Sequence, residues 1–313
     1  MKKIFFFFLV VLLVPTGIIF LLLREKEPKK NGSIIHNGSS IEDKIVRVKR
    51  VSKDTIEEVP LEDYVVGVVS GEMPISFSDE ALKAQAVCAR TYVIRKMDNN
   101  KDKEYDVVDT IDNQVYQDLE ELKNKWKEKY DENIKKLKKI VKETEREYLT
   151  YDGKVIEVFF FSTSNGHTEN SEEVFTKALP YLKSVDSSFD EEVSPVFKKE
   201  VEMSLSDFYT KLSLPYAKQL EYKVLERTQA GSVKKIRING EEYKGTEVRK
   251  LLGIRSTYFE FIVNGTNVLI KTTGYGHGVG MSQYGALALS NKGYTYDKIL
   301  KYYYQGVEIQ KIS

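Results

Sequence analysis

The sequence predicts an α+β protein in which one N-terminal transmembrane helix precedes a mixed domain of two lobes with a central groove. Three observations lead to this expectation. Residues 4–23 form an uncharged run long enough to cross a bilayer, and helical periodicities recur between residues 80 and 147. Short alternating strand patterns, with one helix near residues 246–252, fill residues 196–263. This last region predicts a smaller supporting lobe over about residues 190–265.

The composition excludes several classes of protein. Among 313 residues, 48 Lys and Arg balance 47 Asp and Glu, which removes the strongly basic surface of a nucleic-acid binder. The single cysteine, Cys88, cannot form an intramolecular disulfide or a multi-cysteine metal cage. Because only three histidines are present, a three-histidine metal site would need all of them. We therefore expect no nucleic-acid partner, no metal and no cofactor.

The first 43 residues predict an anchor and a tether. Large apolar residues run directly into Arg24 instead of an A-x-A-like cleavage site, so residues 1–24 are interpreted as an uncleaved signal anchor. Residues 25–43 are rich in charge, Gly and Ser without an apolar period, which predicts a flexible tether. Basic residues flank both ends of the anchor, and their count alone would favour an inward-facing domain.

The folded domain, residues 44–313, is expected to begin with an alternating strand at residues 45–48. Residues 61–69 are apolar and fit either a helix or a strand. They lead into a turn that carries Glu72, next to Met73 and several further apolar residues. An apolar wall raises the pKa of a carboxyl group, so Glu72 is a candidate acid.

An alanine-rich helix is expected over about residues 80–97, with Ser78 as its N-cap. Small residues let another backbone approach closely, so this helix should be central. Lys83 and Arg90 are seven residues apart and share a face. From the pattern alone, they fit a binding surface or a solvated stripe equally well. Cys88 is interpreted as a small buried residue.

A second helical pattern covers residues 118–147, which are mostly charged but carry apolar residues at spacings of three and four. Such an amphipathic helix packs one face on a core and leaves the other in solvent. A scaffold helix is the favoured interpretation, and a partner-binding helix is the alternative.

Two polar loops carry the other candidate site residues. A strand over residues 155–161 is expected to enter residues 162–168, a small-polar loop with one histidine, in which site residues are common. Residues 274–286 carry glycines at alternate positions, which lets a backbone approach a ligand closely. They lead into a helix over residues 282–291, whose first amide groups could bind a carboxylate. Tight structural turns are the alternative for both loops.

Five motifs together resemble the stage II sporulation protein D family, which belongs to a wider group that includes amidase-enhancer proteins. The match runs in order from about residue 57 to residue 305. It implies a lytic transglycosylase that cleaves the MurNAc–GlcNAc bond of peptidoglycan, with 1,6-anhydro-MurNAc formation, during forespore engulfment in sporulation. The motifs are Glu72-Met73-Pro74, ALKAQAVCARTY at 81–92, Gln114-Val115-Tyr116, STSNGHT at 162–168 and GHGVGMSQYGA at 276–286.

The family's catalytic glutamate falls on Glu72. A lytic transglycosylase uses the C6 hydroxyl of muramic acid in place of water, so a single carboxyl group can protonate the leaving oxygen and later accept the hydroxyl proton. The resemblance also implies a set of residues that line a glycan groove. These are Lys83, Arg90, Tyr92, Ser164, His167, His277, Ser282, Gln283 and Tyr284.

The resemblance further implies a cell-membrane protein with a single span and an extracytoplasmic domain, located at the engulfing septal membrane. Its substrate would be stem-free glycan strands, supplied by the amidase/endopeptidase stage II sporulation protein P, with stage II sporulation protein M as a further partner. Some relatives carry zinc ligands just before Gln114, but residues 106–113 hold no Cys or His, so no zinc is expected.

The competing hypothesis is a non-catalytic peptidoglycan-binding module that stimulates a cell-wall amidase. Glu72 distinguishes the two hypotheses, because a pure binder does not need it. A serine hydrolase is excluded because the sequence has no G-x-S-x-G motif.

Overall fold

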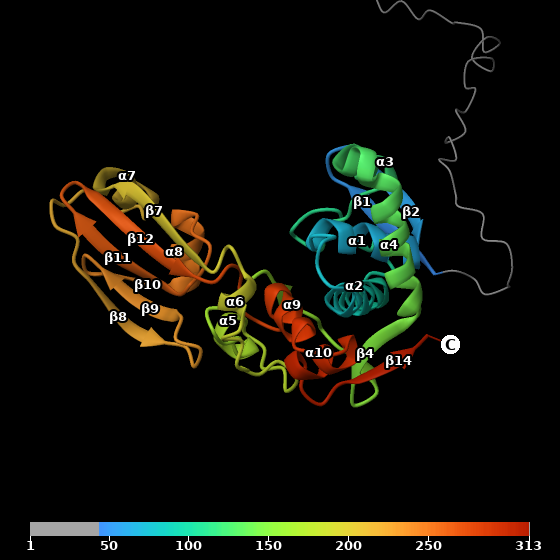
Figure 1. Cartoon of the computed structure of the whole chain (residues 1–313). Helices are drawn as coiled ribbons and strands as arrows, with labels where there is room; N and C mark the ends of the chain where they lie inside the picture. The colour runs from blue at the N-terminus through green and yellow to red at the C-terminus, as the bar shows by residue number, and fades with distance from the viewer. Residues whose placement is uncertain (1–43, 313) are drawn as a thin grey trace, which may run out of the picture. The chain divides into compact units, whose positions relative to one another are not determined.

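The first sheet of the protein is built on an alternating strand, as its sequence predicts. The structure, a computed structural model, describes residues 44–312 (Figure 1); the predicted anchor and tether lie outside these residues. Strand β1 (Ile45–Arg50) pairs antiparallel with β2 (Thr55–Pro60) and parallel with β3 (Val107–Val108). Every second residue of β1 is buried, which confirms the expected strand.

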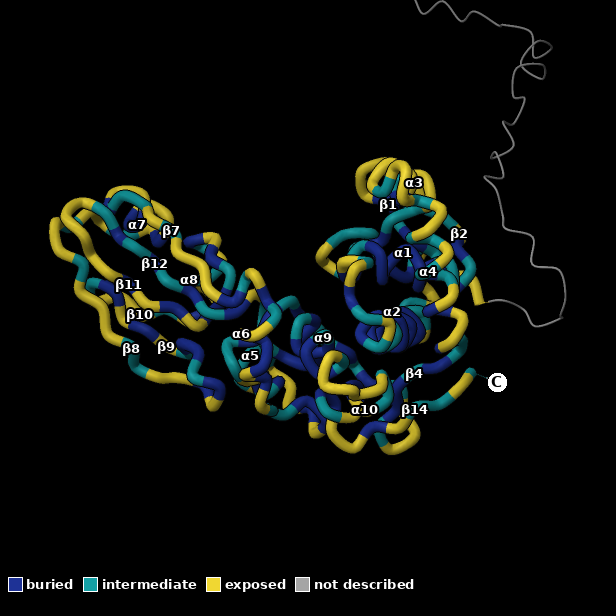
Figure 2. Tube along the Cα trace, viewed as in Figure 1, coloured by how far each residue is buried: buried dark blue, intermediate teal, exposed yellow. Residues whose placement is uncertain are grey.

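Two consecutive helices form the centre of the larger hydrophobic core. The apolar segment that fitted either a helix or a strand is a helix, α1 (Leu61–Glu72). The alanine-rich helix is α2 (Asp79–Asn99), and the Ser78 side chain caps it by accepting a hydrogen bond from the backbone N–H of Ala81. Helix α2 is buried along most of its length (Figure 2) and contacts α1 and several later elements, which confirms its central position.

The amphipathic segment is two helices instead of one. Helix α3 (Leu119–Trp126) begins with a capping box made by Asp118 and Glu121. It ends at Lys127, which has a φ of 49°, and a 3₁₀ turn (Lys127–Lys129) leads into α4 (Tyr130–Glu143). The apolar face of α4 packs on α1 and α2, as the scaffold interpretation expects.

The next segments connect the middle of the chain with its C-terminus. Strand β4 (Glu147–Tyr151) pairs with β5 (Lys154–Val155) and with the last strand, β14 (Glu308–Lys311). The expected continuous strand over residues 155–161 is interrupted, because only Phe160–Phe161 forms a second strand, β6. Strand β6 pairs in parallel with β13 (Met281–Ser282), and α9 (Gln283–Asn291) and α10 (Tyr296–Tyr303) follow it.

A second hydrophobic core lies between residues 205 and 270. One sheet has the order β11-β12-β7 and another has the order β10-β9-β8. The expected helix near residues 246–252 is present, and a further helix, α7, follows the cap residue Ser204. The elements are β7 (Lys198–Ser204), α7 (Leu205–Lys211), β8 (Tyr222–Arg227), β9 (Val233–Ile238), β10 (Glu241–Lys244), α8 (Gly245–Leu252), β11 (Phe259–Asn264) and β12 (Asn267–Thr273).

The described residues are a mixed α+β protein, in agreement with the predicted fold class. Two short helices, α5 (Ser171–Val174) and α6 (Asp190–Val193), border the larger core, against which Val174 and Val193 pack. All described residues belong to one compact unit, so the division into two lobes with a groove stays a prediction. Within residues 44–312, no helix combines the length and apolarity needed to cross a bilayer.

Candidate active site

Glu72 is the last residue of α1, and its carboxyl group is held in a way that favours the protonated form. The backbone N–H of Val115 donates a 2.7 Å hydrogen bond to Oε1. Burial raises the pKa of Glu72 and outweighs this bond, which lowers it. The C-terminal end of a helix also disfavours a negative charge. Among residues 44–312, no cation forms an ion pair with this carboxyl group.

The close approach of residues 114–117 to α1 depends on two glycines. A Cβ on Gly71 would lie 2.3 Å from the carbonyl oxygen of Val115, and a Cβ on Gly67 would lie 2.4 Å from the Tyr116 ring. Neither position therefore tolerates a side chain without displacing this segment. On the same helix, Tyr64 donates a 3.2 Å hydrogen bond to the Gln114 side chain.

Three of the predicted groove residues lie around the turn after Glu72. The Gln283 side chain donates a 3.1 Å hydrogen bond to the Glu72 carbonyl oxygen, and the Tyr284 ring packs edge-on against Phe77 at 5.0 Å. The hydroxyl of Tyr92 accepts a 3.0 Å hydrogen bond from Asn113. Burial raises the pKa of Tyr92 to about 12, with smaller contributions from the charges of Glu157 and Glu72.

Ser164 and Ser282 belong to a different neighbourhood, built on a buried carboxylate that the sequence did not indicate. Asp190 accepts hydrogen bonds from the backbone N–H of Ser164 at 2.7 Å, from Ser187 Oγ at 2.8 Å and from Ser282 Oγ. Burial raises the pKa of Asp190, and these bonds lower it. Ser164 and Ser282 are themselves at most 1% exposed. Their hydrogen bonds to Asp190 therefore connect the loop at residues 162–168 with the loop at residues 274–286 in the protein interior.

The start of α9 offers less to a ligand than the sequence suggested. The backbone N–H of Gly285 donates to Ser282 Oγ at 3.1 Å, and the N–H of Tyr284 donates to the Ser162 carbonyl oxygen at 3.0 Å. Because both amides are already bonded within the protein, neither is free to bind the predicted carboxylate.

Lys83 and Arg90 each form ion pairs with carboxylate groups of the same chain. Lys83 Nζ lies 2.8 Å from Glu80 and 2.7 Å from Glu143. Arg90 is fully buried, and its guanidinium group donates to both carboxylate oxygens of Glu62 and to the carbonyl oxygen of Glu147 at 3.0 Å. In this conformation Arg90 has no exposed surface through which to contact a glycan.

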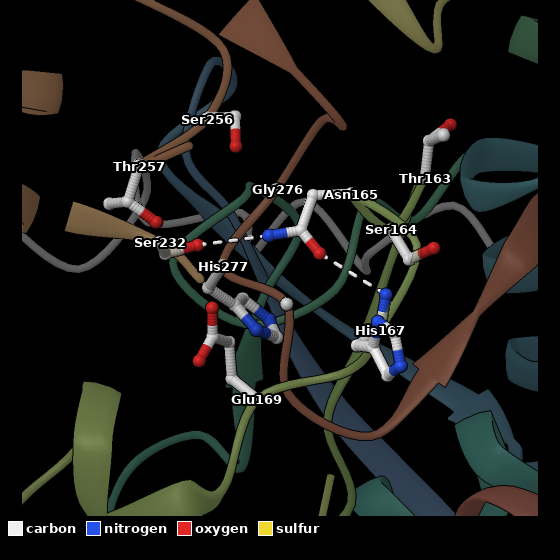
Figure 3. A pocket seen from close by; sticks show the side chains of 11 residues that line it. Thr163, Ser164, Asn165, His167, Glu169, Ser232, Ser256, Thr257, Gly276 and His277 are labelled. Carbon is white, nitrogen blue, oxygen red and sulfur yellow. Dashed lines mark hydrogen bonds between the residues drawn. The ribbon is translucent and has the colours of Figure 1, made fainter. Parts of the chain in front are cut away.

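The two loop histidines line a small polar cavity of about 10 Å³, together with Glu169 (Figure 3). Burial lowers the pKa of His277 to about 4, with a smaller effect from the charge of Arg249. Its Nδ1 accepts a 3.1 Å hydrogen bond from the backbone N–H of Val279, so the ring is neutral at neutral pH. His167, in contrast, is exposed.

Residues 44–312 contain no group of three or more His, Cys, Asp or Glu side chains placed to hold a metal ion. Asp106 and Asp109, in the stretch just before Gln114, form ion pairs with Arg47 and Arg50. Cys88 is buried, as expected, and burial raises the pKa of its thiol to about 12. A thiol that stays protonated is a poor nucleophile and a poor metal ligand.

Comparison with known proteins assigns the chain to a family. A family model described as stage II sporulation protein matches residues 49–151. The chain is 45% identical to stage II sporulation protein D of Bacillus amyloliquefaciens over 271 residues, which cover 85% of this chain and 78% of that protein. Against stage II sporulation protein D of Bacillus subtilis, the identity is 42% over 271 residues, with 85% and 79% covered. An amidase enhancer of Bacillus subtilis is 30% identical over 298 residues, covering 78% of this chain and 40% of that protein. The chain therefore belongs to the stage II sporulation protein D family.

Proposed function

We propose that this sporulation protein is a peptidoglycan lytic transglycosylase, which cleaves the bond between MurNAc and GlcNAc and leaves a 1,6-anhydro-MurNAc end during forespore engulfment. The observation that carries the proposal is the carboxyl group of Glu72. It is partly accessible, its pKa is raised by burial, and its Oε1 is fixed by Val115. A general acid is favoured by this combination of a raised pKa and a fixed orientation.

In the proposed reaction, Glu72 donates its proton to the glycosidic oxygen while the C1–O bond of muramic acid breaks. The carboxylate, still held by the Val115 N–H, then accepts the proton of the C6 hydroxyl as this oxygen bonds to C1. Glu72 returns to its starting protonation state, and no water is consumed. The half-buried side chains of Tyr92 and Tyr284 are proposed to flank the sugar.

The test measures whether oxygen from water enters the cleavage products. Stem-free glycan strands are incubated with the full-length chain in detergent, in water enriched in ¹⁸O, and the products are analysed by mass spectrometry. We expect anhydro-muramic ends without ¹⁸O. Glu72→Gln keeps the size of the side chain but cannot transfer a proton, so the rate should fall by about 10⁴-fold or more. Reducing ends that carry ¹⁸O would indicate a hydrolase instead.

The second candidate function is a binding module that stimulates an amidase, which the similarity to an amidase enhancer favours. In that case the wild-type chain would form no anhydro ends from any stem-free substrate. It would still raise the rate at which a wall amidase releases stem peptides, and Glu72→Gln would raise that rate equally.

The proposed location and partners of the protein follow from its family. We propose that residues 1–24 anchor the chain by a single span in the engulfing septal membrane, with the catalytic domain outside the cytoplasm. Stage II sporulation proteins P and M are the proposed partners, the first as the amidase/endopeptidase that supplies stem-free glycan strands.

A further inference from the structure

Arg249, on α8, is a partly buried cation that the rest of the described chain leaves without a partner. Among residues 44–312, no group forms a hydrogen bond or an ion pair with its guanidinium group. Burial lowers the pKa of Arg249, and Tyr275 is the only described titratable group whose charge raises it. A cation that loses part of its hydration without gaining a partner lowers stability. This guanidinium group is therefore available to an anion that the chain itself does not supply.

The guanidinium group of Arg249 is also accessible from solvent. The residue is of intermediate exposure, and its nitrogen atoms are not among the buried polar atoms of residues 44–312 that lack a hydrogen bond. Since these nitrogens also have no partner within the chain, each of them keeps contact with solvent. A ligand can therefore reach the N–H donors of the group.

An exposed aromatic ring and a second arginine lie at the same place. Tyr275, in the glycine-rich loop at residues 274–286, is 42% exposed. The Arg255 guanidinium group lies over its ring, 4.9 Å from the ring centroid, and like Arg249 it forms no ion pair with a described carboxylate. Aromatic side chains contribute strongly to binding surfaces. The surface around Tyr275 thus combines unneutralised positive charge with an accessible aromatic face.

Hydrogen bonds connect this surface with the turn that carries Glu72. The backbones of Tyr275 and Thr163 exchange two hydrogen bonds, at 2.7 and 3.0 Å. The carbonyl oxygen of the residue before Thr163 accepts a hydrogen bond from the Tyr284 N–H at 3.0 Å. The adjacent Gln283 donates to the Glu72 carbonyl oxygen. A polymeric substrate bound at Glu72 can therefore follow the same two loops to the surface around Tyr275.

We propose that Arg249 binds the lactyl carboxylate of a MurNAc residue in stem-free glycan, with the ring of Tyr275 against the sugar; the identity of this ligand rests on the proposed function. A guanidinium group matches a carboxylate in shape and charge, because two parallel N–H donors meet its two oxygens. While a stem peptide is attached, the lactyl group is a neutral amide with a single carbonyl oxygen. Removal of the stem exposes the carboxylate, so Arg249 makes the protein selective for stem-free strands.

The experiment compares two polymers that differ only at the lactyl group. Stem-free glycan strands, and the same strands with their lactyl carboxylates converted to methylamides, are titrated into the full-length Glu72→Gln chain in detergent. Isothermal calorimetry measures binding. We expect the carboxylate strands to bind about tenfold or more tightly than the amidated strands, because hydrogen bonds to charged groups are the strong ones. Adding Arg249→Gln should remove this preference by weakening the binding of the carboxylate strands alone.

Lys250→Gln is the matched control. Lys250 is the next residue of α8 and is exposed, so this substitution changes the net charge by the same amount and should keep the preference. An equal loss of the preference in Arg249→Gln and Lys250→Gln would indicate general electrostatic attraction and would overturn the proposal. Equal binding of the two polymers to the chain that retains Arg249 would also overturn it, even if Arg249→Gln failed to fold.

A stem tripeptide with a free C-terminal carboxylate forms the second arm, as a competitor for the carboxylate strands. If the tripeptide displaces them, the site binds the stem peptide, and the assignment to the lactyl group is wrong. The binding measurement needs no cleavage, so this proposal and the proposed function can fail separately. A preference for carboxylate strands without any anhydro ends would contradict only the proposed function, and anhydro ends without the preference would contradict only the role of Arg249.

Discussion

The backbone N–H of Val115 donates a 2.7 Å hydrogen bond to Oε1 of Glu72, across 43 residues of sequence. The bond needs Gly71, since any Cβ at that position would collide with the Val115 carbonyl group. The orientation of the proposed acid therefore depends on a neighbour that has no side chain. Because the bond favours the carboxylate and burial favours the carboxyl group, the segment around Val115 also adjusts the pKa of Glu72.

We expect Gly71→Ala to impair cleavage by displacing Val115. Overpacking of this kind costs about 1–3 kcal/mol of stability, and the loss of the Val115 hydrogen bond should raise the pKa of Glu72 further. The pH profile of cleavage should then shift to higher pH. Gly245→Ala, whose Cβ would collide with the Val233 carbonyl oxygen in the second core, serves as the control and should lower stability without this shift. An unchanged pH profile in Gly71→Ala would contradict the positioning role of Gly71.

The raised pKa of Glu72 predicts the pH dependence of cleavage and of stability. Cleavage needs the protonated acid, so its rate should fall as the pH rises through the raised pKa. In the same window, above the ordinary pKa of a glutamate, the folded protein binds more protons than the unfolded one, so stability falls as the pH rises. Glu72→Gln should lack this fall. Urea unfolding of both proteins at several pH values measures it, and parallel curves would argue against a raised pKa.

We expect Asp118→Ala to destabilise the first sheet. Asp118 caps α3 and binds the fully buried Arg50 at 2.9 Å. Burial alone would raise its pKa, but hydrogen bonds from Glu121 N–H, Lys53 and Arg50 lower it overall. The loss of a cap and a charged hydrogen bond costs about 1–3 kcal/mol.

A lowered pKa means that Asp118 stabilises the fold above its unfolded pKa and loses this effect as the pH falls through the folded value. The difference in unfolding free energy between wild type and Asp118→Ala should therefore shrink in acid. Asp102→Ala, at an exposed residue, is the control. A difference that stays constant down to pH 2 would contradict the ion-pair account.

Arg90→Lys separates a structural role from a glycan contact. Lysine keeps the charge but loses the planar group that donates to both oxygens of Glu62. We expect a loss of about 1–3 kcal/mol in unfolding free energy and an unchanged KM for stem-free glycan. A higher KM at unchanged Tm would instead support the glycan contact predicted from the sequence.

The proposed topology is tested by protease digestion of sporulating cells. After removal of the outer wall layers, an added protease should degrade residues 44–313, because the proposed anchor at residues 1–24 leaves them outside the cytoplasm. A cytoplasmic protein, which should resist digestion until the membrane is lysed, is the control. Full protection of the domain would show that the orientation is reversed.

Local signals were sufficient to predict part of this fold. The start of α2 was predictable from the cap residue Ser78, which lies next to it in sequence. Helix α1 could not be distinguished from a strand because it is buried on nearly all sides, which removes the amphipathic period. The pairing of β6 with β13 was not predictable, since strands of two residues have no measurable alternation.

The candidate site shows the same limit. Glu72 could be proposed from its apolar surroundings, but the contribution of Val115 comes from a backbone N–H and leaves no trace in residue type. Asp190 lies in an acidic stretch that resembles a solvated surface, and its partners come from positions as distant as Ser282. Arg90 shows the converse limit, because a charged residue in a helix gives no sign of whether a carboxylate elsewhere in the chain, here the half-buried Glu62, neutralises it.

The position of Gln283, late in the sequence, has a consequence for the synthesis of the protein. Glu72 emerges early from the ribosome, whereas Gln283, which binds its carbonyl group, and β14, which pairs with β4, lie in the last part of the chain. A prematurely terminated chain would carry the proposed acid without the groups that close the turn around it. If the protein cleaves peptidoglycan as proposed, we expect a chain truncated before Gln283 to leave the wall of its own cell uncleaved, because it lacks the hydrogen bond that holds the turn after Glu72.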